Sequence, residues 1–518
     1  MAIYDYTCST FTDFNDPKNV KQYKQALQTI TGHFGKRCPL IINGKRVKTE
    51  TQLASTNPAN HSEVVGHIDQ AGIPEADRAM DAALNAFTSW KTVSVNVRAD
   101  VLFKAAAIMR RRRYELSALM TKEAGKPYAE ADGDTAEAID FLEYYGRQII
   151  ALQDTDKAIL SRPDVERNEY RYIPLGVGVI ITPWNFPLAI LTGMTSAAVV
   201  SGNTVLIKPA GPTGVIAHTF VEILEEAGLP DGVVNFVPGK GSEIGNYLVK
   251  HPKTRFVSFT GSKEIGILIS ENAAKVQPSQ IWLKRVIAEM GGKNAIIVDE
   301  GVDPKDAARY ATSSAFGYSG QKCSACSRLI VHESVYDEVL EKLKEATDAI
   351  RVGDPADANT FMGPVIDEHA FQSIAEYIDI GKQEGRLLIG GTVDNNTGWF
   401  IEPTIFADVN PNARIMQEEI FGPVLAVTKV NNFNEALDVA NGTEFGLTGA
   451  VLSTNREHLE RARDEFHVGN LYFNRGCTGS IVGYQPFGGF NMSGTDAKAG
   501  GPDYLLLHLQ AKTVTEAL

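Results

Sequence analysis

Cys323 is the residue of this sequence best suited to covalent chemistry. It belongs to the stretch FGYSGQKCSACSR (residues 316–328), between turn-forming residues and an apolar run typical of a strand. A thiolate is the best side-chain nucleophile near neutral pH, and we expect a mobile loop beside Lys322 to lower the pKa of this thiol. Cys323 is therefore the candidate nucleophile of an enzyme.

Two ordinary interpretations compete with this one. Most cysteines of intracellular proteins are small buried side chains without a chemical role. Cys326 also completes a C-x-x-C pair with Cys323, which is typical of a redox dithiol or of half a zinc site. No second pair and no histidines at ligand spacing accompany it, so we expect no metal, whereas the dithiol stays open.

Two further candidates follow β-branched runs that predict strands. Asn185 belongs to TPWNFP (182–187), where its amide could hold an oxyanion or, more ordinarily, cap a helix. Ser262 ends FTGS (259–262) at a predicted helix start, where free N–H groups and the helix dipole suit a phosphate. This stretch lacks the middle glycine of G-x-G-x-x-G, so alone it indicates a dinucleotide site only weakly.

Glu289 is a candidate general base because it stands beside two flexible glycines in EMGGKN (289–294). The ordinary alternative is an exposed glutamate in a turn. Lys208 ends a predicted strand in KPA (208–210), where a dinucleotide enzyme would contact the adenosine ribose. The loops EEIFGPV (418–424) and PFGGF (486–490) mix glycine, proline and aromatic residues, and each could be a structural turn.

The elements that must position these residues follow from hydrophobic patterning. Alternating apolar runs and helical patterns predict a parallel sheet that is buried on both faces and binds ligands beyond the carboxyl ends of its strands. We expect its strands at 176–182, 204–208, 233–237, 255–260 and 295–298, with helices starting near Pro187, Thr213, Ser242 and Ser262. A second α/β block follows to about Asn474, with a helix at 304–318, a strand at 328–332 and a helix at 335–350.

Outside these blocks, the pattern predicts amphipathic helices and two isolated strands. Apolar residues spaced three and four apart predict helices at 76–91, 98–123 and 134–152. The polar, alternating stretch 159–173 and the C-terminal stretch 505–518 read as strands with no obvious core to cover. We expect them to pair with another part of the chain or with another subunit.

Composition limits the class of protein. The chain has 518 residues, of which 43% are hydrophobic and 22% charged, which is typical of a globular enzyme of about three units at ~150 residues per domain. The net charge of -13 argues against a nucleic-acid partner, and the basic run 110–113 lies in a helical pattern as a solvated face.

The sequence also predicts a reducing compartment. Five cysteines, an odd number without framework spacing, and an N-terminus without a secretion signal favour the cytoplasm. Residues 172–207 carry no charge, but Pro183, Asn185 and Pro187 divide them into pieces too short to cross a bilayer. We therefore expect no membrane span.

Seven motifs, TPWNFP, KPA, FTGS, EMGGKN, GQKC, EEIFGPV and PFGGF, together and in this order resemble the NAD(P)-dependent aldehyde dehydrogenase superfamily. The resemblance runs from Gly44 to the C-terminus. It implies an α/β fold with a Rossmann-type NAD-binding domain (1–155 and 175–288), an α/β catalytic domain (289–485) and a small β oligomerisation ribbon with the C-terminal strand (156–174 and 486–518). It also implies a homodimer or a higher homo-oligomer.

The resemblance also implies roles for the candidate residues. Cys323 attacks the aldehyde carbon to give a thiohemiacetal, and the Asn185 amide with the Cys323 N–H holds its oxyanion. Hydride passes to the nicotinamide and leaves a thioester, and Glu289 activates the water that releases the acid. The implied cofactor contacts are Thr182, Pro183 and Trp184, Lys208 at the adenine-side ribose, Gly261 and Ser262 at the pyrophosphate, and Glu419 with Phe421 at the nicotinamide ribose and ring.

Within the superfamily, residues 282–289, 322–324, 478–483 and 491–496 are most similar to the branch that oxidises L-glutamate γ-semialdehyde, in equilibrium with 1-pyrroline-5-carboxylate, in proline breakdown. Both charges of such a substrate need partners, because burying an unpaired charge is costly. The resemblance implies that Gly479, Ser480 and Ser324 receive the carboxylate and that Glu137 faces the ammonium group. Phe186 and Phe487 would flank the aliphatic chain, with Lys322 nearby.

Two departures from the family pattern leave alternatives open. Gly211 follows KPA where many NAD-preferring relatives carry glutamate, so we expect NAD as the cofactor and leave use of NADP open. Cys326 replaces a commonly small residue, which leaves open an inhibitory disulfide with Cys323. Rival functions are oxidation of another aldehyde such as succinate semialdehyde, a nicotinamide-independent cysteine hydrolase or acyltransferase, and a non-catalytic descendant of the fold. Against the hydrolase stand Glu419 and the FTGS turn, which would have no role without a dinucleotide.

Overall fold

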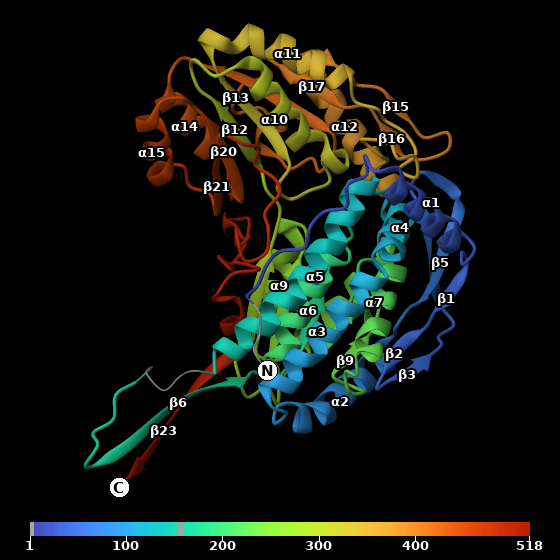
Figure 1. The fold of residues 1–518 in the computed structure, drawn as a ribbon, viewed down its shortest axis with the longest axis vertical. Coiled ribbons are helices and arrows are strands. Elements are labelled where there is room, and N and C mark those ends of the chain that lie inside the picture. Colours follow the sequence, from blue (N-terminus) through green and yellow to red (C-terminus); the bar gives the residue numbers. More distant parts are fainter. Residues whose placement is uncertain (1–4, 154–158) are drawn as a thin grey trace.

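The structure, a computed structural model, describes residues 5–153 and 159–518. Figure 1 shows two lobes, one above the other, and a thin two-stranded arm that projects from the lower lobe and carries the C-terminus. Each lobe is built around a seven-stranded sheet. The site lies where the two sheets approach each other, so their order and direction matter first.

The sheet of the lower lobe is doubly wound. Its strand order is β11-β10-β7-β8-β9-β2-β3, and the first five strands are parallel. In chain order these five lie 3-2-1-4-5, so the topological switch point falls between β7 and β10, where such sheets bind ligands. The strands are β2 (Leu40–Ile42), β3 (Lys45–Val47), β7 (Val177–Ile181), β8 (Thr204–Lys208), β9 (Val234–Phe236), β10 (Phe256–Thr260) and β11 (Arg285–Glu289).

The sheet of the upper lobe is mostly parallel. Its order is β14-β17-β18-β13-β12-β20-β21, with β14 antiparallel at one edge. The strands are β12 (Asn294–Val298), β13 (Cys326–His332), β14 (Arg386–Ile389), β17 (Thr404–Ala407), β18 (Val424–Val430), β20 (Thr448–Leu452) and β21 (Asn470–Phe473).

The placement of β12 corrects the prediction that residues 295–298 extend the first sheet. Strand β11, which the pattern did not predict, takes that place, and β12 opens the second sheet. Only residues 290–293 separate the two strands, whereas a crossover between parallel neighbours needs a dozen or more residues. The chain therefore leaves the carboxyl edge of one sheet and enters the amino edge of the other.

Helices cover both faces of the lower sheet. The helix predicted at 98–123 is two helices, because the backbone departs from helical geometry at Arg112 (φ -98°, ψ 14°). The helices of this lobe are α1 (Pro17–Thr31), α2 (Ile73–Trp90), α3 (Val95–Arg111), α4 (Arg113–Ala124), α5 (Tyr128–Ala151), α6 (Ala189–Val200), α7 (Gly214–Glu226), α8 (Asn246–Lys250) and α9 (Lys263–Ala274).

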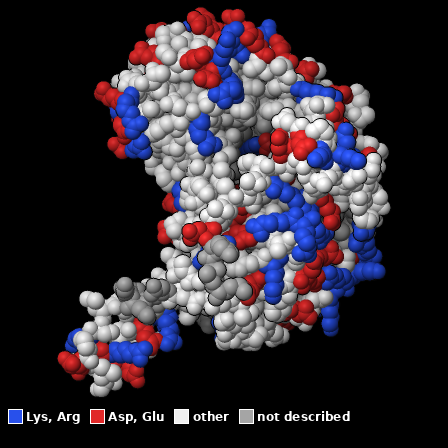
Figure 2. Space-filling view, in the orientation of Figure 1, with Lys and Arg blue, Asp and Glu red and all other residues white. Residues whose placement is uncertain are grey.

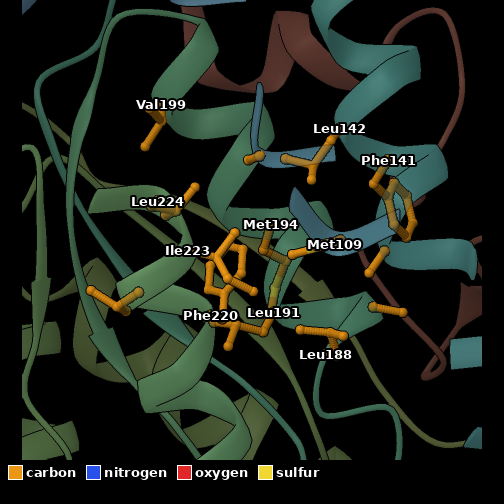
Figure 3. Close-up of a cluster of buried hydrophobic side chains, with 14 of the residues drawn as sticks. Met109, Phe141, Leu142, Leu188, Leu191, Met194, Val199, Phe220, Ile223 and Leu224 are labelled. Atoms are coloured by element: carbon orange, nitrogen blue, oxygen red, sulfur yellow. The ribbon is translucent and has the colours of Figure 1, made fainter. Parts of the chain in front are cut away.

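Helix α6 accounts for the uncharged stretch of the sequence. All its residues except Ile190 are buried, and Figure 3 shows Leu191, Met194 and Val199 among side chains of α3, α5 and α7. Fully burying one such side chain stabilises the fold by roughly 1.5–3 kcal/mol. Among the described residues, no helix is both long and apolar enough to cross a membrane.

The basic run 110–113 is a set of ion pairs within the chain. Arg110 pairs with Glu143, Arg111 with Glu226, Arg112 with Glu115 and Arg113 with Asp132. Figure 2 shows basic and acidic side chains interspersed over the face it presents. These pairs agree with the prediction of a solvated face.

The remaining elements are the helices of the upper lobe and the strands of three smaller sheets. A three-stranded sheet has the order β1-β5-β4, and two further pairs are β15-β16 and β19-β22. The helices are α10 (Pro304–Phe316), α11 (Tyr336–Asp348), α12 (Glu368–Glu384), α13 (Arg414–Gln417), α14 (Phe433–Asn441) and α15 (Arg456–Glu465). The strands are β1 (Lys36–Cys38), β4 (Gln52–Asn57), β5 (Asn60–Asp69), β15 (Val393–Asp394), β16 (Phe400–Ile401), β19 (Phe445–Gly446) and β22 (Phe490–Asn491).

The projecting arm joins the two strands that the sequence left without a core. β6 (Glu166–Pro174) pairs antiparallel with β23 (Leu509–Ala517) along its whole length. The residues before β23 lie against the body of the molecule, where Leu505 is fully buried. The division of the chain into domains stays a prediction, and its boundary at 155/156 touches residues outside the described ranges.

Candidate active site

The cysteine loop between α10 and β13 is held by hydrogen bonds on both sides. Tyr318 and Ser319 have positive φ angles of 50° and 56° and are buried, and their hydroxyls donate to backbone carbonyl groups of other segments. The Asn294 amide donates to the carbonyl groups of Cys323 (2.7 Å) and Ala325 (2.9 Å). These contacts argue against the mobile loop expected from the sequence and fix the backbone of Cys323.

Cys323 lies where two cavities meet. It lines a cavity of about 370 Å³ on the side of α5 and a cavity of about 760 Å³ on the side of α9, and both volumes fall in the usual range of ligand sites. One nucleophile thus faces two separate spaces. This arrangement allows a reaction between two ligands that approach the cysteine from opposite sides.

The expected effect of Lys322 on the thiol is wrong. The Lys322 ammonium group points away into an ion pair with Glu130 at 2.6 Å. Burial raises the pKa of the Cys323 thiol, and the neighbouring carboxylates of Glu419, Glu289 and Glu137 raise it further. In this state the thiol keeps its proton at neutral pH.

Glu289 is a buried carboxyl group without a well-formed hydrogen bond. It ends β11, is 9% exposed, and neither side-chain oxygen has a hydrogen bond of good geometry among the described residues. Burial raises the pKa of Glu289 well above its usual range, against the smaller opposite effects of the Lys498 ammonium group and the Gly489 N–H nearby. The alternative of an exposed turn residue is therefore wrong. An unpaired buried acid costs stability, so its presence beside Met290, which lines the larger cavity, indicates a functional role.

Asn185 does not cap a helix. Helix α6 begins at Ala189, and the residue at its cap is Leu188. The buried Asn185 amide instead donates to the carbonyl of Gln321 at 3.0 Å, two residues before Cys323. An amide carries two N–H groups, so one stays available to a ligand in the larger cavity, which Asn185 lines together with Cys323.

A fully buried ion pair supports this region, and the sequence reading missed it. The Lys126 ammonium group donates to Asp134 (3.0 Å) and to the backbone carbonyl of Asn185 (2.6 Å). It also lies over the rings of Phe186 (3.8 Å) and Tyr318 (4.3 Å). Burial lowers the pKa of Lys126 and raises that of Asp134. The break between two predicted helices was the one sequence signal for this lysine.

The larger cavity collects most of the predicted cofactor residues. Trp184 and Phe421 meet edge to face at 5.5 Å, and the Ser262 hydroxyl accepts from the N–H of Ile265 at the start of α9. Burial raises the pKa of Glu419 to about 7, and its carboxylate accepts from the N–H of Gly292 at 2.8 Å. The predicted residues that line it are Pro183, Trp184, Asn185, Gly261, Ser262, Glu419 and Phe421.

Two predicted cofactor residues lie outside that lining. Thr182 is buried after β7, and Lys208 ends β8 with its ammonium group bonded to the carbonyls of Pro209 and Gly239. Burial lowers the pKa of Lys208 to about 8.

Residue 291 in the larger cavity is a glycine because a Cβ there would lie 2.1 Å from the Glu419 carboxylate. A helix N-terminus, a carboxylate that lines the cavity and two aromatic rings in contact, all near the switch point, fit a dinucleotide.

The smaller cavity collects all the predicted substrate residues. They are Glu137, Phe186, Lys322, Ser324, Gly479, Ser480 and Phe487. Gly479 has a positive φ of 80°, and the Ser480 hydroxyl lies 2.5 Å from that of Tyr472. Apolar side chains together with several charged and hydroxyl groups suit a short aliphatic molecule that carries polar groups.

Helix α5 brings five carboxyl groups to this cavity, and four of them are occupied. Glu130 pairs with Lys322, and Asp134 with Lys126. Asp132 pairs with Arg113, and Asp140 accepts from Ser9. Among the described residues, only the fifth, Glu137, has no hydrogen-bond or ion-pair partner, and burial raises its pKa to about 8.

Cys326 is buried in the second sheet. It is 2% exposed, begins β13, and its thiol donates to the carbonyl of Arg328 at 3.3 Å. Burial raises the pKa of Cys326, as does the nearby thiol of Cys477. All five cysteines are free, and a disulfide between Cys323 and Cys326 stays a prediction.

These features are those of an aldehyde-oxidising enzyme, and comparison with known proteins gives the class. A profile of the aldehyde dehydrogenase family matches residues 46–514, and this chain belongs to that family. It is 62% identical to the 1-pyrroline-5-carboxylate dehydrogenase of Geobacillus thermodenitrificans over 99% of both chains, and 59% identical to that of Bacillus cytotoxicus, again over 99% of both. The solved structure of a 1-pyrroline-5-carboxylate dehydrogenase from Thermus with bound NAD superposes with a TM-score of 0.98, at 49% identity and full coverage of both chains.

Removing the charge of Asp134 tests the buried ion pair. We expect Asp134→Asn to lower the free energy of unfolding by about 3–5 kcal/mol, because it leaves the Lys126 ammonium group buried without a counter-charge. Urea denaturation measures this loss. The matched control is Asp306→Asn, whose exposed pair with Arg309 contributes little. Equal losses in the two variants would show that the buried pair has no special weight.

Proposed function

We propose that this chain oxidises L-glutamate γ-semialdehyde, in equilibrium with 1-pyrroline-5-carboxylate, to L-glutamate with NAD as the oxidant. The observation that carries the proposal is the position of Cys323 between two cavities: a larger one lined by most of the predicted cofactor residues, and a smaller one lined by Glu137, a carboxyl group without a partner among the described residues. The substrate is supported by the 1-pyrroline-5-carboxylate dehydrogenases that are about 60% identical over 99% of the chain. Such a reaction belongs to proline breakdown.

The residues of the larger cavity would hold NAD at defined points. Ser262 and the free N–H groups of α9 would bind the pyrophosphate, Glu419 the nicotinamide ribose, and Phe421 the ring. NAD, when bound, would supply the hydride acceptor. Loss of the hydride would convert the thiohemiacetal on Cys323 into a thioester. Lys208 at the end of β8 is proposed to meet the adenine-side ribose. Gly211 brings no carboxylate that would repel the 2'-phosphate of NADP, so NADP is a second candidate cofactor.

The chain's own residues perform the remaining steps. Cys323 loses its proton to solvent and attacks the aldehyde carbon, and the free N–H of the Asn185 amide with the Cys323 N–H stabilises the oxyanion. Glu289 then takes a proton from the water that attacks the thioester. The acid is released, and the Cys323 thiolate that leaves takes up a proton, from Glu289 or from solvent, to restore the thiol. The unpaired state of Glu289 leaves both its oxygens available for this task.

The smaller cavity provides partners for both charges of the substrate. Glu137 would receive the ammonium group, whose positive charge favours the ionised carboxylate despite its raised pKa of about 8. The N–H groups of Gly479 and Ser480 with the Ser324 hydroxyl would receive the carboxylate, and Phe186 and Phe487 the aliphatic chain. Succinate semialdehyde has no ammonium group and would leave Glu137 unpaired, so it is a weaker candidate.

We also propose that the enzyme is a homodimer or larger homo-oligomer in the cytoplasm. The arm of β6 and β23 projects from the body with unpaired outer edges, which favours pairing with another subunit. The molar mass in solution, compared with that of a chain lacking residues 509–518, tests this part. The five free cysteines support a reducing compartment.

NADH absorbance with purified protein tests the proposed function directly. We expect rapid NAD reduction with 1-pyrroline-5-carboxylate and much slower reduction with succinate semialdehyde or propanal, because only the first offers both charges. Cys323→Ala should lose turnover and still bind NAD. If the reduced protein reduced neither NAD nor NADP with any of these aldehydes, the result would favour the cysteine hydrolase.

Glu289→Gln isolates the general base. We expect steady-state turnover to fall by about 100-fold or more, because the neutral amide cannot take a proton from water. A rapid first burst of NADH should remain, since thioester formation does not need this group. Glu300→Gln, an exposed glutamate just after β12, is the control that should keep its activity. Wild-type turnover in Glu289→Gln would remove the assignment.

The pH dependence of turnover follows from the two raised pKa values. Cys323 and Glu289 must both lose protons to act, and burial raises the pKa of each, so the active form accumulates only as pH rises. We expect kcat at saturating NAD and substrate to increase between about pH 6 and pH 9. Stopped-assay or absorbance profiles over this range measure it, and a profile that falls with pH contradicts the assignment.

A further inference from the structure

The extended chain before α1 crosses the substrate cavity. Residues 6–12, here called the N-terminal strap, form no helix or strand, and Phe11 and Thr12 line the smaller cavity. The strap is fixed to α5 at two points. Ser9 donates its N–H and its hydroxyl to Asp140, both at 2.7 Å, and Thr12 donates its N–H and its hydroxyl to Asp132, both at 2.8 Å.

The other end of the strap holds the loop of residues 479–483, here called the anchor loop. The Tyr6 hydroxyl donates to the carbonyl of Val482 at 2.9 Å, and its ring packs edge to face on Tyr144 of α5 at 5.2 Å. Gly483 permits this approach, because a Cβ there would lie 2.8 Å from the Tyr6 ring, and its φ is +78°. The strap therefore connects α5 to the loop that carries the proposed carboxylate contacts.

The strap also occupies carboxyl groups of α5 that line the cavity. It is the partner of Asp140, and it adds two hydrogen bonds to Asp132, which Arg113 also holds. Glu130 and Asp134 pair with lysines, so among the described residues Glu137 is the one carboxyl group of the five without a partner. One free carboxylate and one set of backbone N–H groups, at a fixed separation, match an amino-acid aldehyde.

We propose that the N-terminal strap determines substrate specificity by holding the anchor loop against α5 at the separation from Glu137 that an amino-acid aldehyde requires. This inference rests on the proposed function, and within it Tyr6 is a positioning residue that touches no reacting atom. The family profile begins at residue 46 and leaves the strap outside, whereas the alignments with 1-pyrroline-5-carboxylate dehydrogenases cover 99% of the chain. The strap thus lies outside the part of the chain that the family profile matches.

Tyr6→Phe tests the strap with the smallest change. It removes the hydroxyl bond to Val482 and keeps the ring, so we expect KM for glutamate semialdehyde to rise about fivefold, as for one lost hydrogen bond, with kcat within about twofold. KM and kcat for propanal, which makes no carboxylate contact, should not change. Hydrogen–deuterium exchange of the anchor-loop amides should become faster, which measures the loop without any substrate.

Two further variants bracket this result. Tyr336→Phe removes a hydroxyl bond of the same 2.9 Å length, to Asp408 in the upper lobe, and should change neither KM for glutamate semialdehyde nor the exchange of the anchor-loop amides. Ser9→Ala weakens the hold on Asp140 and should raise KM for glutamate semialdehyde in the same direction. Equal effects of Tyr6→Phe on both aldehydes, or unchanged KM and exchange, would overturn the strap's role. A wild-type enzyme without preference for glutamate semialdehyde would instead overturn the proposed function, while the exchange result still decides whether the strap holds the loop.

Discussion

The buried ion pair of Lys126 and Asp134 is the interaction on which the rest of the site depends. Its two side chains are fully buried, and they join three segments that are distant in sequence: helix α5, the loop after β7, and the cysteine loop through the ring of Tyr318. A charge pair in such a place is costly unless every polar atom has a partner. Here the Lys126 ammonium group and the Asp134 carboxylate are both bonded to backbone groups as well, so the pair fixes the backbone of Asn185, the proposed oxyanion ligand, relative to the cysteine loop.

A second constraint comes from the short connection between the sheets. Residues 290–293 are too few for a crossover to a parallel neighbour, and β12 instead starts the second sheet. The carboxyl edge of the first sheet is therefore linked directly to the amino edge of the second. Glu289 at the end of β11 and Cys323 before β13 are thereby brought to one place from two lobes. Because this place lies between two hydrophobic cores, Glu289 and Cys323 are buried, and burial raises the pKa of both groups.

Helix α5 is strongly acidic, and neighbouring groups pair with most of its carboxyl groups that line the smaller cavity. Its five cavity-facing carboxyl groups would together repel a substrate carboxylate and compete for an ammonium group. Lysines, one arginine and the N-terminal strap occupy four of them, and the fifth, Glu137, has no partner within residues 5–153 and 159–518. In the proposed function, the occupied carboxyl groups would contribute to specificity as much as the one that remains.

The sequence by itself determined the family, the chemistry and most of the elements. The order of seven motifs identified the resemblance. The apolar runs predicted β7, β8, β9 and β10, because a strand buried on both faces consists of consecutive apolar residues. Only the tertiary structure decided that β12 belongs to the second sheet, that Lys322 pairs with Glu130 and leaves the thiol pKa raised, and that Glu289 is buried. It alone also revealed the Lys126–Asp134 pair and the strap. The physical reason is that burial and pairing depend on which distant segments meet, and a local pattern of residue types carries no information about that.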